Sequence, residues 1–205
     1  MAIHAVRIMS ADDYRKLQAQ DAIVADLRLP LDYLQGHLEG AVSLPGTRYH
    51  LRYQLAEIGT ERPLILIAQA PVDIDPFIHE AEAAGAQVTG ILTGAPRGWQ
   101  ARGLPVLAWS AVVPAALGEW AGPTPTLVDL GEPEEESSAD WPNPRRLPLS
   151  GWTRETVEEL AQGPTILLGV TARLRYAAIR LFEGGARHVY FGQTTRSSTG
   201  SAPVH

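Results

Sequence analysis

Short apolar runs alternate along the chain with stretches of helical pattern. In the first half, apolar runs at residues 22–26, 62–68 and 87–92 have the length and composition of strands buried on both faces of a sheet. Helical segments lie between them, one beginning after Ser10, which can cap it, and one at residues 76–84. This alternation predicts an α/β fold with a mostly parallel central sheet flanked by helices.

The second half of the chain repeats landmarks of the first half at an offset of about 100 residues. The repeated pairs are Asp26 and Asp129 at the ends of apolar runs, Leu44-Pro45 and Leu147-Pro148, the runs ending at Ala68 and Leu168, and Gly85 and Gly185. Gly85 suits a left-handed helix C-cap. We therefore predict an internal duplication, with domains at residues 1–106 and 107–193 that meet near residues 106–110. Residues 194–205, rich in Ser, Thr and Gly, are expected to form a flexible tail.

Composition excludes several classes of function. The net charge is -6 and the 17 Lys and Arg residues are scattered, which disfavours nucleic acid as a partner. No apolar stretch approaches the roughly 20 residues that span a bilayer, and the N-terminus has no secretory pattern, so we expect a cytoplasmic protein without membrane contact. The six histidines (4, 37, 50, 79, 188 and 205) are not clustered at metal-ligand spacing, and we expect neither a metal nor another cofactor.

The chain contains no cysteine. Disulfides, thiolate metal sites and every cysteine nucleophile are therefore excluded within it. The acidic segment at residues 132–138 is expected to form a solvated turn and short helix in the second domain.

One long motif in the first half resembles the N-terminal motif of the rhodanese superfamily. It consists of Asp26-Leu-Arg28, Asp32-Tyr33, Gly36-His37-Leu-Glu-Gly40-Ala41 and Pro45, and it is followed later by Leu92-Thr-Gly94, Trp99 and Gly103-Leu-Pro-Val106. The resemblance covers about residues 6–107 and implies two rhodanese-like domains in tandem, the second more divergent and truncated. In the second half, Gly131 stands where the family has arginine and Asp140 where it has histidine. We expect Asp26 to pair with Arg28, and His37 to be a hydrogen-bonded turn residue rather than a catalytic base.

The resemblance also locates the loops that hold the family's chemistry. In rhodaneses the strand equivalent to residues 62–68 ends in the catalytic cysteine, and a loop of backbone N–H groups follows at a helix N-terminus. Family spacing places the first vestigial loop at Ala68, Gln69, Ala70, Pro71, Val72, Asp73 and Ile74. The second lies at Leu168, Gly169, Val170, Thr171, Ala172, Arg173 and Leu174, with either Leu168 or Gly169 at the cysteine position.

The two loops differ in their predicted affinity for anions. Pro71 lacks an N–H donor, and Asp73 and Asp75 would repel an anion at the first loop. The second loop is the candidate anion site, with Gly169, Thr171, Arg173 and Arg175 as its binding residues. Alternatively, its two arginines are solvated or pair with the acidic stretch at residues 132–136.

Two functions follow as hypotheses. The first is a catalytically inactive tandem rhodanese-like protein that acts in binding, regulation or scaffolding, with a link to sulfur metabolism, for a protein partner or a small anion. The second is an enzyme with a cysteine-independent mechanism that uses Asp73, Asp75, His79 or His37 as acid–base groups in the same crevice.

Overall fold

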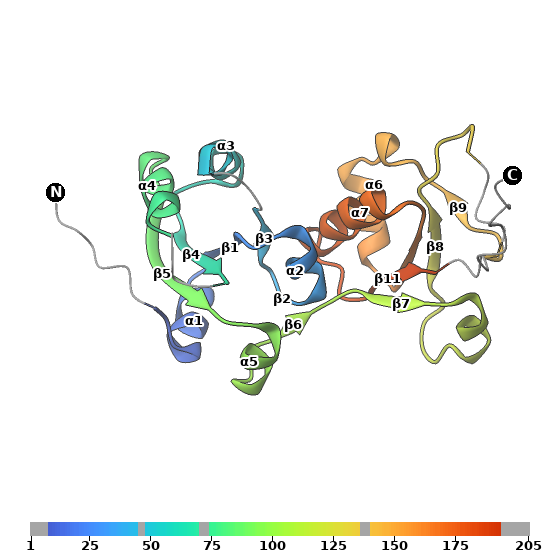
Figure 1. The fold of residues 1–205 in the computed structure, drawn as a ribbon, viewed down its shortest axis with the longest axis horizontal. Helices are drawn as coiled ribbons and strands as arrows, with labels where there is room; N and C mark the ends of the chain where they lie inside the picture. Colours follow the sequence, from blue (N-terminus) through green and yellow to red (C-terminus); the bar gives the residue numbers. More distant parts are fainter. Residues whose placement is uncertain (1–7, 45–47, 70–73, 136–139, 194–205) are drawn as a thin grey trace, which may run out of the picture. The chain divides into compact units, whose positions relative to one another are not determined.

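A computed structural model of the chain describes residues 8–44, 48–69, 74–135 and 140–193, with residues 48–50 described by their backbone alone. These residues belong to two compact units that divide after residue 108 (Figure 1). Each unit is built around a parallel sheet with helices, which confirms the predicted α/β class with mostly parallel sheets. Among the described residues, no helix combines the length and apolar composition needed to cross a bilayer.

The first unit contains a four-stranded parallel sheet in the order β3-β1-β4-β5. Its strands are β1 (Ile23–Asp26), β3 (Val42–Ser43), β4 (Pro63–Ala68) and β5 (Gln87–Thr93), and a parallel bridge from Ile8 to Ile91 extends it beyond β5. A small antiparallel pair joins β2 (His37–Leu38) to β6 (Val106–Leu107). The helices are α1 (Ala11–Gln18), α2 (Pro30–Gln35), α3 (Arg48–Ile58), α4 (Asp75–Ala83) and α5 (Pro96–Ala101).

Alternation of side chains along β1 and β4 divides the core of the first unit between the two faces of the sheet. Ile23 and Leu66 belong to the cluster that packs against Leu51 of α3 and Ile78 of α4. Figure 1 shows α3 and α4 on this side of the sheet, with α1 and α5 on the other. Because both faces are covered, β1 is buried along its whole length, as its unbroken apolar run predicts.

Two helix ends of the first unit form at the capping residues that the sequence predicts. The Ser10 side chain accepts a hydrogen bond from the Asp13 amide and caps α1. Gly85, just after α4, has a φ of 89°, which is the left-handed conformation of a C-cap glycine.

The second unit contains a five-stranded parallel sheet in the order β7-β11-β10-β8-β9. Its strands are β7 (Ser110–Val112), β8 (Thr126–Asp129), β9 (Arg145–Arg146), β10 (Thr165–Leu168) and β11 (Val189–Gly192). The helices are α6 (Arg154–Ala161) and α7 (Thr171–Glu183), with 3-10 turns η1 (Pro114–Glu119) and η2 (Leu149–Gly151). Residues 132–135 of the acidic segment form a turn; residues 136–139, and the predicted tail from residue 194, lie outside the described residues.

Both units use the same strand order, with β8, β9, β10 and β11 of the second unit in the places of β1, β3, β4 and β5. Backbone hydrogen bonds make the equivalence specific. The amide of Leu27 donates to Ile67 at 2.9 Å, and the amide of Leu130 donates to Leu168 at 2.9 Å. If the aspartates ending β1 and β8 are matched, Ile67 therefore corresponds to Leu168, and the residue after it, Ala68, corresponds to Gly169.

The neighbouring strand gives the same alignment. The amide of Leu44 donates to the carbonyl of Asp26 at 2.9 Å, and the amide of Leu147 donates to that of Asp129 at 2.8 Å. Between these landmarks the two units have segments of equal length, so residues 27–44 correspond to 130–147. Gly40 and Asn143 then fall at one position, and both have a positive φ, 78° and 46°. Asn is the residue that tolerates this conformation best after Gly.

Candidate functional site

A buried ion pair closes the carboxyl end of β1. Asp26 is fully buried and Arg28 nearly so, and the guanidinium contacts both carboxylate oxygens, with Nη2–Oδ2 at 2.6 Å and Nε–Oδ1 at 2.9 Å. Nη2 also donates to the carbonyl of Gly36 at 2.7 Å, and the guanidinium lies 4.7 Å from the centre of the Trp99 ring. The expected pairing of Asp26 with Arg28 is present, and it commits the charge of Arg28 to the protein itself.

His37 lies beside this ion pair and is buried from solvent. Its ring stacks on Tyr33 with centroids 3.8 Å apart, and Nδ1 is 2.9 Å from the Tyr33 carbonyl oxygen. Burial, with a further contribution from the Arg28 charge, lowers the pKa of His37 from 6.5 to about 4. At neutral pH the imidazole is uncharged, and Nδ1–H can donate to the Tyr33 carbonyl, which suits a structural residue.

A crevice of about 330 Å³ opens where β1, β4 and β5 end. Its lining comes from the segments after these strands and consists of Arg28, Asp32, Gln35, Gln69, Gly94, Ala95 and Pro96. Ligands of open α/β sheets bind outside the carboxyl ends of the strands, so this is the expected place for a site. We call it the first crevice.

The first crevice has an unbalanced charge. Arg28 is already neutralised by Asp26, whereas Asp32 has no ion-pair partner among the described residues. Gln35 and Gln69 add neutral amides. The described lining therefore presents a carboxylate and hydrogen-bonding amides, which favour groups that carry N–H donors and oppose anions.

The structure covers the first vestigial loop only at its ends. Ala68 ends β4, Gln69 lines the first crevice, and Ile74 precedes α4 and is buried. Ala70, Pro71, Val72 and Asp73 lie outside the described residues. The other proposed acid–base groups, Asp75 and His79, are exposed on α4 and are not part of the crevice lining.

In the second vestigial loop, an acidic residue holds Arg173. Its guanidinium contacts both carboxylate oxygens of Glu135, at 2.5 and 3.0 Å, and these hydrogen bonds lower the pKa of Glu135 to about 2. Gly169 has a φ of 143°, and a Cβ there would lie 3.3 Å from that of Leu130, so this position favours glycine. An anion at this loop would have to compete with Glu135 for Arg173. The predicted anion site stays a prediction.

The remaining residues of the second loop surround this pair. Leu168 and Leu174 are buried, whereas Val170, Thr171 and Ala172 are exposed around the start of α7. Arg175 is half-buried, and its Nε has no hydrogen-bond partner.

In the second unit, the arginine near the aspartate that ends the central strand comes from the neighbouring strand β9. Asp129, like Asp26, accepts a hydrogen bond from the amide two residues later, here Gly131 at 2.9 Å. A Cβ on Gly131 would lie 3.1 Å from Oδ1 of Asp129 and 3.2 Å from Nη2 of Arg146. Arg146 of β9 also donates to the carbonyls of Gly131 and Glu132. A guanidinium from β9 thus occupies the region that the side chain of Arg28 fills in the first unit.

Sequence reasoning located Arg28 and Gln69 but missed other parts of the first crevice. Asp32 was noted only as part of a motif, and Gln35 and Ala95-Pro96 carried no signal because they come from separate segments. Within the described ranges, no three His, Asp or Glu side chains lie together in an arrangement that could hold a metal ion.

No family model matches the chain, and no curated protein sequence matches it. Among solved structures it is similar to a full-length protein from Lactobacillus plantarum, with 19% identity and a TM-score of 0.38 over 48% of this chain and 81% of that one. It is similar to a thiosulfate sulfurtransferase from Pseudomonas aeruginosa, with 16% identity and a TM-score of 0.39 over 93% of this chain and 44% of that one. A 3-mercaptopyruvate sulfotransferase from Escherichia coli, described as having the "Rhodanese" fold, gives 18% identity and a TM-score of 0.39 over 95% of this chain and 100% of that one. These TM-scores are too low to assign a family.

Proposed function

We propose that the chain is a tandem rhodanese-like protein that binds a ligand or partner and does not transfer sulfur. One observation carries the proposal: the residues that end or follow the central strands, Ala68 and Gly169, have no nucleophilic side chain, and the chain contains no cysteine. The motif around Asp26 and Arg28 and the common strand order of the two units support the family relationship.

Without a cysteine the sulfur-transfer reaction cannot take place at all, rather than merely being slower. In sulfur transfer a thiolate attacks the sulfane sulfur of the donor, the donor anion departs, and a persulfide forms for the acceptor to attack. Neither a methyl group at position 68 nor a hydrogen atom at position 169 can form that bond. The same argument applies to every reaction that needs a cysteine nucleophile.

The charge of the first crevice supports a proposal about the class of ligand that binds there. Thiosulfate is a dianion, and here it would meet the Asp32 carboxylate and an arginine that is already paired. A guanidinium or ammonium group would instead find a carboxylate and the oxygens of two amides. We therefore propose that the first crevice binds a group with N–H donors, carried by a small molecule or by a partner protein.

The first experiment tests inactivity. Protein prepared from a host that lacks sulfurtransferases is mixed with thiosulfate and cyanide, and thiocyanate is measured against a heat-killed sample. We expect no difference between the two samples. Turnover above the heat-killed level would contradict the proposal. The Ala68→Cys variant shows whether the surrounding loop can still support transfer once a thiol is present.

The second experiment tests binding. The full chain, labelled with ¹⁵N, is titrated with methylguanidinium and, separately, with thiosulfate. We expect methylguanidinium to shift the amide resonances of Gln69 and Gly94, and Asp32→Asn to weaken its binding about 3-fold, the value of one partly exposed ion pair. Glu57→Gln, which removes one carboxylate from an exposed position on α3, is the matched control and should leave binding unchanged. Shifts with thiosulfate but not with methylguanidinium would refute this proposal.

A further inference from the structure

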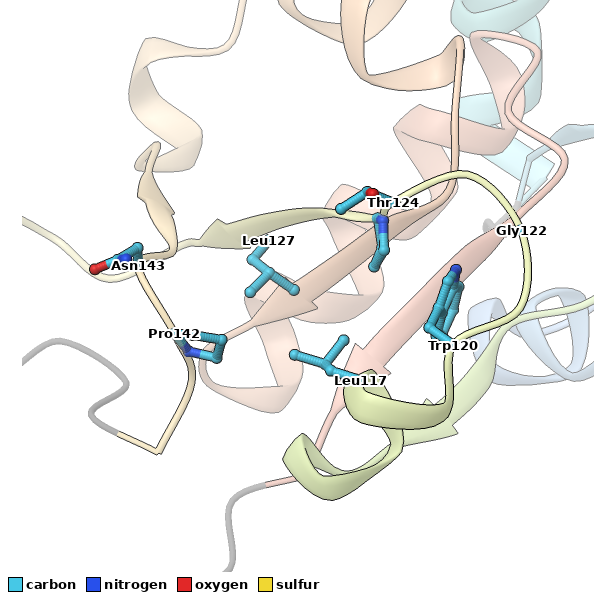
Figure 2. Close-up of a pocket in the computed structure, with 8 residues that line it drawn as sticks. Leu117, Trp120, Gly122, Thr124, Leu127, Pro142 and Asn143 are labelled. Carbon is cyan, nitrogen blue, oxygen red and sulfur yellow. The ribbon is translucent and has the colours of Figure 1, made fainter.

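A second cavity, of about 390 Å³, lies within the second unit and away from its vestigial loop. We call it the η1 pocket; it is lined by Leu117, Trp120, Gly122, Thr124, Pro125, Leu127, Pro142 and Asn143. Figure 2 shows the side chains of Leu117, Trp120 and Leu127 converging on one space beside the loop that carries Thr124. None of the lining residues has a charged side chain.

The helix that precedes the first central strand is shorter in the second unit than in the first. In the first unit, α1 connects the segment at Ile8 to β1, and in the second unit η1 connects β7 to β8. Crossovers between parallel strands are right-handed, so α1 and η1 cover the same face of their sheets. Helix α1 has eight residues and buries Tyr14 completely, whereas η1 has six residues and buries none.

Equivalent residues show what fills this space in the first unit. By the alignment from Asp26 and Asp129, Leu127 corresponds to Val24 and Pro142 to Glu39. Gln18 of helix α1 donates to the carbonyl of Glu39 at 3.3 Å, and Val24 is buried, with 2% of its surface exposed. Leu127, in contrast, is only partly buried and lines the cavity.

Tyr14 is the buried aromatic residue of α1 on this face. Burial, with a further contribution from the Glu39 carboxylate charge, raises the pKa of Tyr14 to about 12. The second unit retains the face of the sheet but has no buried aromatic residue from its connecting turn.

The aromatic wall of the η1 pocket is held in place before any ligand arrives. The indole N–H of Trp120 donates to the carbonyl of Pro123 at 2.9 Å. The rings of Trp120 and of Tyr190 in β11 form a T-shaped pair, with centroids 5.1 Å apart and planes at 81°. A ligand ring that stacks on Trp120 therefore does not have to order it first, which reduces the entropic cost of binding.

We propose that the η1 pocket binds a small uncharged aromatic molecule, such as a phenol or an indole. The cavity lies within the size range of small-molecule sites, and its lining of Trp, Leu and Pro suits a planar apolar ring. The Asn143 amide can form a hydrogen bond with a single polar substituent of the ligand. A charged ligand is disfavoured because it would lose hydration without meeting an opposite charge. This inference does not depend on the function proposed for the first crevice.

The test uses p-cresol, which is the side chain of tyrosine as a free molecule. The full chain with ¹³C-labelled methyl groups is titrated with p-cresol, and the resonances of Leu117 and Leu127 are followed. We expect saturable shifts at both leucines with a dissociation constant on the order of 1 mM, which is reasonable for a ligand of this size. The anion 4-methylbenzoate, of nearly the same shape, should bind at least about 10-fold more weakly.

Two variants at one exposed position separate pocket binding from general apolar contact. Thr124→Trp places a ring in the cavity and should weaken p-cresol binding at least about 10-fold, whereas Thr124→Ala keeps the space open and should change it by less than about 3-fold. Because Thr124 is exposed in a loop, neither variant removes core packing. Absence of saturable shifts at the two leucines, equal binding of 4-methylbenzoate, or undiminished binding to the Thr124→Trp variant would each overturn the inference.

Discussion

Acidification from pH 7.5 to pH 4.5 is expected to destabilise the first unit through a single buried imidazole. The pKa of His37 is about 4 in the folded protein and 6.5 for an unperturbed histidine. Between these values the unfolded chain binds a proton that the folded unit excludes. The contribution is therefore fully present above pH 6.5 and is lost as the pH falls from 6.5 towards 4.

The size of this effect follows from the two pKa values. Their difference corresponds to about 3 kcal/mol when the pH is well below 4, and to about 2.5 kcal/mol at pH 4.5. Glu135 belongs to the second unit, so its titration lies outside the unit whose unfolding is followed.

Urea unfolding at pH 7.5 and pH 4.5 measures the effect, with the amide resonances of β4 as a probe confined to the first unit. Wild-type protein should lose about 2.5 kcal/mol of unfolding free energy between the two conditions. His37→Gln lacks the titrating group, so it should lose much less, whatever its stability at pH 7.5. Equal losses in the two proteins would refute the assignment of the pH dependence to His37.

Three further predictions concern packing and charge. Arg28→Ala leaves the carboxylate at the end of β1 buried without its partner and should cost about 3–5 kcal/mol in urea unfolding of the first unit; a loss below about 1 kcal/mol would contradict this. Gly192→Ala places a Cβ 2.2 Å from a core leucine and should cost about 1–3 kcal/mol in thermal unfolding, whereas Gly151→Ala, with no atom within 4 Å of the new Cβ, should cost much less. Glu135→Gln should release Arg173 and increase sulfate binding at the second loop, measured by NMR titration; unchanged binding would argue against an anion site there.

Much of the fold could be predicted because its signals are local. The apolar run at 62–68 forms β4, the serine at position 10 caps α1, and Asp26 pairs with an arginine only two residues away. In each case the residues that carry the signal also make the contact, so no knowledge of distant segments is required.

Other elements gave no such signal. Strand β9 consists of Arg145 and Arg146, and only backbone pairing with β8 makes it a strand. Helix α3 has a weak apolar pattern with charged residues such as Arg52 and Glu57, and it was not predicted. The η1 pocket could not be foreseen either, because it depends on how much of a sheet face a short turn leaves uncovered.

The two arginines of β9 have a consequence for the behaviour of the protein at high concentration. Strand β9 is an edge of its sheet, and such an edge offers unpaired backbone groups to a strand of another molecule. Arg145 forms an exposed ion pair with Glu159, and the Arg146 guanidinium is anchored to loop carbonyls. A second chain that tried to extend the sheet here would have to strip water from Arg145 and break its pair, so amyloid-like stacking should not begin at this edge.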